Sequence, residues 1–164
     1  MLMSDLSLVL ISLHIGAAVT WIGGMLFLSL VLAPLLRQAD DPSSFKVLFG
    51  MAARRFRLVV RLTIVILIGT GPLLLEARGL SITEPSSWPY VLCVKLTLVG
   101  LLLLFTFLHD LLLGPRVLRI GSQPAAARTT QDLLLLSASR LVPRLALLTA
   151  LAVLVAAAVL ARSD

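Results

Sequence analysis

Long apolar runs with little or no charge are the feature of this sequence that most limits how the chain can fold. No Asp, Glu, Lys or Arg occurs between Leu6 and Leu36, and three further apolar runs follow. A helix that crosses a hydrocarbon layer of about 30 Å needs roughly 20 apolar residues. Membrane strands alternate polar and apolar residues, and these runs do not. We therefore predict an all-α integral membrane protein, a four-transmembrane-helix bundle built on Leu6–Leu36, Leu62–Leu75, Val91–Leu113 and Leu145–Ala161.

The composition excludes other classes of protein. Hydrophobic residues make up 59% of the chain and charged residues 13%, whereas a water-soluble domain carries about 25% charged residues. Disordered chains are polar and highly charged, so they are excluded as well. The single cysteine, Cys93, excludes a disulfide scaffold. The first run follows Asp5 rather than a basic segment and exceeds the roughly 7–15 apolar residues of a signal peptide, so we interpret it as a retained helix.

Basic residues gather in the connection between the first and second helices and in that between the third and fourth. Because Lys and Arg are retained on the cytoplasmic side, we expect both termini outside a prokaryotic-type inner membrane. The net charge of +6 then describes a lipid-facing collar beside the anionic inner leaflet. No nucleic-acid-binding motif accompanies these residues. The collar consists of Arg54, Arg55, Arg57, Arg61, Arg140 and Arg144.

The two basic connections resemble one another. Their matching positions are Arg57 with Arg140, Arg61 with Arg144, and Ala33-Pro34 with Gly114-Pro115. We interpret the match as a duplication of a helical hairpin, with chance similarity between arginine-rich membrane borders as the alternative. The chain is then a single membrane domain over 1–164, with hairpin 1 at about 1–78, an outer loop at about 79–89 and hairpin 2 at about 90–164.

Each connection is also predicted to hold an interfacial helix. Asp41-Pro42 is a suitable start for the first, because Asp caps helices and Pro fits their first turn. The apolar residues that follow, up to Ala52, recur at helical spacing and predict an amphipathic stretch on the inner leaflet. In the second connection Thr130 is the predicted cap.

Few ionisable residues lie within the runs, and these carry the functional prediction. Such groups are costly in a bilayer, so they usually face protein, where they pair or serve a function. His14 shares one helical stripe with Ala18, Trp21 and Met25. The small Ala18 leaves space for a flat ligand or a neighbouring backbone. The structural alternative is a buried histidine that donates to a carbonyl.

Lys95 and His109 share a stripe of the third run, and Asp110 follows His109. His109 lies near the basic border, where pairing with Asp110 or an arginine competes with metal ligation as an explanation. At about 1.5 Å rise per residue, His14 and His109 differ in depth by roughly 20 Å. Ligands of one metal must converge within about 2 Å of it. If both histidines bind metal, we therefore expect separate sites.

The first run resembles a known family. Residues 13–24, Leu-His-Ile-Gly-Ala-Ala-Val-Thr-Trp-Ile-Gly-Gly, resemble the first-helix pattern of copper-resistance D (CopD-type) membrane proteins and of the related bacterial membrane protoporphyrinogen oxidases (HemJ-type). Lys95 and a later histidine on the same helix are also similar to that group. The oxidase branch binds haem b. The resemblance implies that His14 is a haem ligand, that Trp21 belongs to the cofactor site, and that Lys95 pairs with a propionate or a substrate carboxylate.

These observations lead us to expect a membrane protein that binds haem b, or a related tetrapyrrole, with a redox, electron-transport or haem-handling role. If the chain is an enzyme, the resemblance implies an oxidoreductase like protoporphyrinogen oxidase, with no catalytic residue assigned. Two alternatives stay open. One is copper transport across the inner membrane, with His14 and His109 as separate metal sites. The other is a non-catalytic accessory subunit of a larger membrane complex. A homo-oligomer is compatible with each of them.

Overall fold

The computed structural model describes residues 2–38, 42–121, 124 and 128–162, and within these ranges the chain forms helices and loops without a strand. Four helical segments are long and apolar enough to cross a membrane. The predicted all-α membrane fold is therefore confirmed by the length and composition of its helices. The four segments are Asp5–Leu35, Val47–Ala77, Tyr90–Val117 and Thr130–Leu160.

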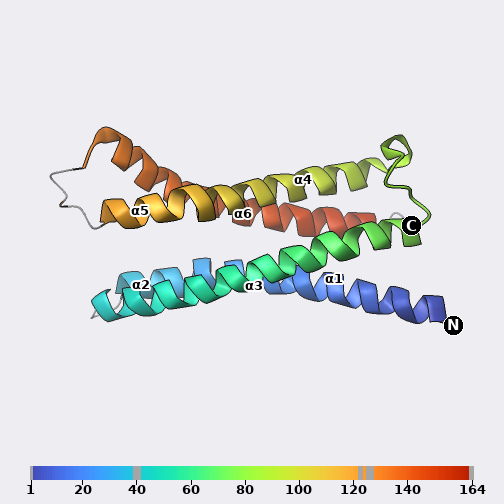
Figure 1. The fold of residues 1–164 in the computed structure, drawn as a ribbon, viewed down its shortest axis with the longest axis horizontal. Coiled ribbons are helices and arrows are strands. Elements are labelled where there is room, and N and C mark those ends of the chain that lie inside the picture. The colour runs from blue at the N-terminus through green and yellow to red at the C-terminus, as the bar shows by residue number, and fades with distance from the viewer. Residues whose placement is uncertain (1, 39–41, 122–123, 125–127, 163–164) are drawn as a thin grey trace. The chain divides into compact units, whose positions relative to one another are not determined.

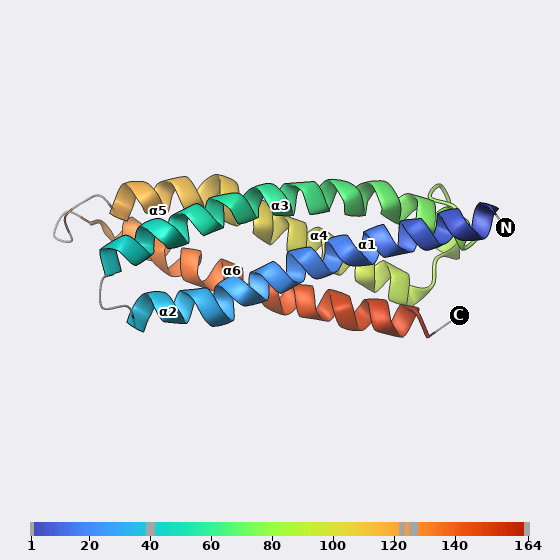
Figure 2. The same cartoon turned by 90° about the horizontal axis from the view of Figure 1, so that it is seen from below.

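The chain divides into two compact units, Met1–Trp88 and Pro89–Asp164. In the first, hairpin 1, α1 (Leu2–Leu26) packs against α3 (Pro42–Ala77). In the second, hairpin 2, α4 (Tyr90–Phe107) packs against α6 (Thr130–Leu160). The two helices of each hairpin run antiparallel (Figures 1 and 2). The π-helical segment η1 (Phe27–Leu32) and α2 (Ala33–Gln38) extend α1, and η3 (Leu108–Leu113) and α5 (Gly114–Gly121) extend α4 in the same order.

Both π-helical segments end beside a proline. The backbone N–H of Ala33 donates to the carbonyl of Leu28, and that of Gly114 donates to the carbonyl of His109. Each bond therefore reaches one residue further back than in an α-helix. Pro34 and Pro115 follow directly, lack an N–H and crowd the carbonyl four residues earlier. The wider π-turn accommodates the proline without ending the helix, at the same place in each hairpin.

Local capping defines several helix ends. Gly79 adopts a positive φ of 74°, and its N–H donates to the Glu76 carbonyl while that of Leu80 donates to the Leu75 carbonyl. This Schellman motif ends α3. The following loop contains the short 3-10 helix η2 (Pro85–Ser87), and it is closed by Trp88, whose indole Nε1 donates to the Ser81 carbonyl over 2.8 Å.

Two predictions about the connections were wrong. The interfacial helix predicted up to Ala52 is not separate, because α3 continues from Pro42 to Ala77. No Gly-Pro or other strong helix breaker stands between the amphipathic and apolar parts, so their backbone hydrogen bonds run on. Asp41, the predicted cap, lies outside the described residues. The cap of α6 is Thr129 rather than Thr130, in a reciprocal capping box with Asp132.

The two helices of hairpin 1 approach each other closely at Gly24. A Cβ atom added to Gly24 would overlap the aromatic ring of Phe56 on α3. Small residues allow such approach between membrane helices, whose association depends on packing rather than on the hydrophobic effect. Gly23 is its matched neighbour, since a Cβ atom there would meet nothing within 4 Å.

We predict that Gly24→Ala destabilises hairpin 1 by about 1–3 kcal/mol, because Phe56 must leave its position to admit the methyl group. Gly23→Ala is expected to keep stability unchanged or raise it by up to about 1 kcal/mol, because alanine is the better helix former and its methyl group meets no neighbour. Loss of helicity during titration with a denaturing detergent measures both effects. Equal stability of the two variants would show that α1 and α3 do not meet at this point.

Candidate functional site

His14 lies on α1 inside hairpin 1, half-buried, with its imidazole directed at α3. Its Nδ1 atom is 2.7 Å from the hydroxyl oxygen of Thr70. A Cβ atom added to the adjacent Gly71 would be 3.8 Å from the ring carbon Cε1, in ordinary van der Waals contact. Thr70 itself is 7% exposed. The ring therefore joins the two helices of hairpin 1 through a side-chain hydrogen bond.

The hydroxyl of Thr70 determines which ring nitrogen of His14 carries the proton. Its only hydrogen is donated to the Ile66 carbonyl, one turn back on α3, over 2.7 Å. The hydroxyl oxygen therefore accepts from His14, and Nδ1–H is the donor. In the neutral imidazole the lone pair then belongs to Nε2. Metal-binding histidines have this arrangement, in which a hydrogen bond from one nitrogen fixes the tautomer and orientation of the ring.

Thr70 was not identified from the sequence. It stands in an apolar run between Gly69 and Gly71. A hydroxyl between two glycines is a usable signal, because small neighbours let a facing side chain reach it. Its partner could not be assigned, since the register of α1 against α3 depends on packing rather than on sequence spacing.

Trp21 lies two turns from His14 along α1 and is 4% exposed, so it is among the most buried side chains described. Ala18 and Met25, the other members of the predicted stripe, are half-buried. Ile15 and Val19, on other faces of α1, are exposed. The predicted stripe therefore coincides with the less exposed face of this helix.

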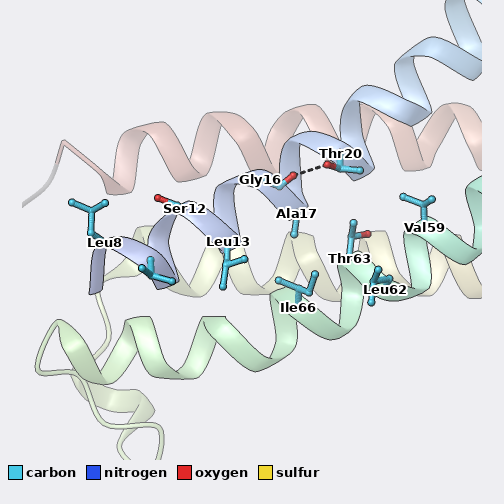
Figure 3. A pocket seen from close by; sticks show the side chains of 11 residues that line it. Leu8, Ser12, Leu13, Gly16, Ala17, Thr20, Val59, Leu62, Thr63 and Ile66 are labelled. Carbon is cyan, nitrogen blue, oxygen red and sulfur yellow. Dashed lines mark hydrogen bonds between the residues drawn. The ribbon is translucent and has the colours of Figure 1, made fainter. Parts of the chain in front are cut away.

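A groove runs along the seam between α1 and α3, with a volume of about 560 Å³ (Figure 3). Its walls are apolar apart from three hydroxyl groups, of which Thr20 donates to the Gly16 carbonyl of its own helix. His14 does not line the groove. Leu13, beside it in sequence, does, so the groove borders the same turn of α1. Its lining residues are Leu8, Val9, Ser12, Leu13, Gly16, Ala17, Thr20, Val59, Leu62, Thr63 and Ile66.

Lys95 lies on α4 in hairpin 2 and is half-buried. It precedes Pro115 by the same number of residues as His14 precedes Pro34. In the same register Leu102, 2% exposed, corresponds to the buried Trp21. The two hairpins therefore carry an ionisable side chain at one corresponding position, an imidazole in hairpin 1 and an ammonium group in hairpin 2.

His109 and Asp110 lie in the π-helical segment η3 of hairpin 2. The Nδ1 atom of His109 is 3.7 Å from a carboxylate oxygen of Asp110, and the two side chains are 40% and 17% exposed. This contact matches the pairing considered from the sequence. In the described residues no group of three or more His, Cys, Asp or Glu side chains converges on a possible metal position.

The arginines of the collar lie on the long helices α3 and α6. Arg57 is half-buried and the other five are exposed. Arg57 and Arg61 are one helical turn apart, as are Arg140 and Arg144, so each pair shares a helix face. Arg61 and Arg144 precede the most apolar part of their helices.

Comparisons of the chain with protein-family models, curated proteins and solved structures gave no match. The candidate site is therefore defined by the residues of this chain alone.

We predict that Thr70→Val destabilises hairpin 1 by about 0.6–2 kcal/mol, because the Nδ1–H group of His14 loses its acceptor. Thr70→Ser keeps a hydroxyl and is expected to lose less. Thr63→Val is the matched control, since that hydroxyl donates only to the Val60 carbonyl of its own helix. Unfolding free energies in mixed micelles measure all three. A Thr70→Val variant as stable as Thr63→Val would remove the interhelical bond from this account.

Proposed function

We propose that this chain is an integral membrane protein that binds haem b, or a related tetrapyrrole, and that His14 would be the residue that holds its iron. One observation carries the proposal: Thr70 accepts from Nδ1, so the Nε2 lone pair of His14 is held in a fixed orientation. An axial histidine of a haem protein needs this tautomer and a second group to orient it.

The donor set favours haem over a metal ion held by protein ligands alone. A porphyrin supplies four nitrogen ligands itself, so one well-oriented imidazole suffices for attachment. A copper or zinc site needs several converging side chains, and none converge in sets of three within the described ranges. When bound, the haem would supply one-electron or porphyrin redox chemistry.

Other residues of the chain have roles in this proposal. Trp21, buried two turns from His14, would offer an apolar ring to the macrocycle. Lys95, at the equivalent position of hairpin 2, would neutralise a propionate or a substrate carboxylate. The resemblance to CopD-type and HemJ-type proteins supports both roles. If the chain is an enzyme, that resemblance favours an oxidoreductase acting on a porphyrin.

The proposal includes an orientation in a prokaryotic-type inner membrane. The collar arginines lie between the basic connections and the most apolar parts of α3 and α6, and basic connections are retained on the cytoplasmic side. The termini then lie outside, and His14 lies in the outer half of the bilayer. Assembly into a homo-oligomer or a larger membrane complex fits this arrangement.

A second candidate function is favoured by the same hydrogen bond. Because His14 joins α1 to α3 through Thr70, its role can be purely structural, in a non-catalytic accessory subunit of a membrane complex. Copper transport is the third hypothesis, and it assigns His14 and His109 to separate metal sites.

The visible absorption spectrum of the purified protein distinguishes these functions. We expect a Soret band and about one haem per chain after expression with haem precursor, because His14 provides the axial ligand. His14→Ala is expected to remove more than about nine tenths of the bound haem. His109→Ala is the matched control and should retain it, since that side chain contacts Asp110 instead.

The other outcomes have definite meanings. A colourless protein that binds copper stoichiometrically, with loss in either histidine variant, would replace the haem proposal with copper transport. A colourless protein that binds no copper and assembles normally in both variants would favour the accessory subunit. Retention of haem by His14→Ala would overturn the ligand assignment.

A further inference from the structure

Each hairpin carries two arginines that have no protein counterion in the described structure. Arg57 and Arg61 on α3, and Arg140 and Arg144 on α6, form no ion pair with any residue described there. Between Pro42 and Leu75 the sequence of α3 contains no Asp or Glu. On α6 the one carboxylate, Asp132, is engaged in the capping box with Thr129.

These charges directly precede the most apolar parts of α3 and α6. Arg61 is followed on α3 by the exposed Leu62 and Val65, and Arg144 on α6 by the exposed Leu145 and Leu148. A guanidinium at this margin is costly unless an anion neutralises it. The anion must therefore come from outside the described chain and must tolerate apolar neighbours.

Spacing and chemistry identify that anion. Side chains four residues apart on a helix lie about 5–6 Å from each other, so two guanidinium groups can reach one phosphate. Guanidinium groups form paired hydrogen bonds with phosphate oxygens, and this favours a phosphate group over a monatomic anion. An acidic protein segment would leave the adjacent leucines and valine uncovered, whereas a phospholipid places its acyl chains beside them.

We propose that each hairpin binds the phosphate headgroup of an anionic phospholipid, through Arg57 and Arg61 in hairpin 1 and through Arg140 and Arg144 in hairpin 2. The recurrence of the pair at matching positions of the two hairpins gives two sites of the same design. This inference does not depend on haem binding.

The test measures lipid selectivity at the protein surface. The full chain is reconstituted in phosphatidylcholine vesicles containing a trace of spin-labelled phosphatidylglycerol or spin-labelled phosphatidylcholine. The motionally restricted fraction of each label gives their relative affinity. We expect a preference for phosphatidylglycerol of about fivefold or more, since a basic residue near an anionic surface contributes about that factor. The quadruple variant Arg57→Gln/Arg61→Gln/Arg140→Gln/Arg144→Gln should abolish it.

Matched variants separate specific binding from net charge. The double variant Arg57→Gln/Arg61→Gln should lose part of the preference for phosphatidylglycerol. The double variant Arg78→Gln/Arg162→Gln removes the same charge at the opposite helix ends and should keep that preference. Replacing Arg57, Arg61, Arg140 and Arg144 by lysine keeps the charge and should leave a weaker preference. Helical circular dichroism confirms that each variant is folded.

Three results would overturn the proposal. The first is equal affinity of the unchanged protein for both labelled lipids. The second is an equal loss of preference in Arg78→Gln/Arg162→Gln. The third is displacement of the labelled lipid by soluble glycerol phosphate at the same concentration, which would show recognition of a free phosphate rather than of a lipid.

Discussion

A hydrocarbon interior offers no water to a carbonyl, an imidazole or a guanidinium, and this constraint governs where the polar groups of the chain lie. Hydroxyl groups in the helices donate to carbonyls one turn back, as Thr20, Thr63 and Thr149 do. Thr70 does the same and also accepts from His14, so its oxygen serves two partners. Because of this double role, the hydroxyl of Thr70 holds the imidazole of His14 in one tautomer at the contact between α1 and α3.

The two hairpins share a backbone plan and differ in their side chains. Each has a long helix, a π-turn before a proline, a short helical extension and a returning helix. Proline explains the recurring π-turn, because its ring excludes the usual hydrogen bond at that point. At the position where hairpin 1 has His14, hairpin 2 has Lys95. The two hairpins therefore carry different ionisable groups at one corresponding position.

The sequence predicts some features of this structure better than others. The four apolar runs predict the helices, because composition and length alone determine whether a segment can span a bilayer. The division of α3 was predicted wrongly, since a change from amphipathic to apolar character does not by itself break a helix. The helix continues through Gly50, and no proline stands near the end of the amphipathic stretch. The contact of His14 with Thr70 depends on interhelical register, to which intrahelical periodicity gives no access. The assignment of a cofactor to His14 stays a prediction.

The central claim is that the hydroxyl of Thr70 fixes the imidazole of His14 with its proton on Nδ1. Nitrogen NMR of protein labelled with ¹⁵N-histidine, in lipid and without added haem, measures this directly, with His109→Gln used to assign the signals. We expect a protonated, pyrrole-type Nδ1 and an unprotonated, pyridine-type Nε2 for His14 in the neutral ring. A neutral ring protonated on Nε2, or one that exchanges between both tautomers, would contradict it.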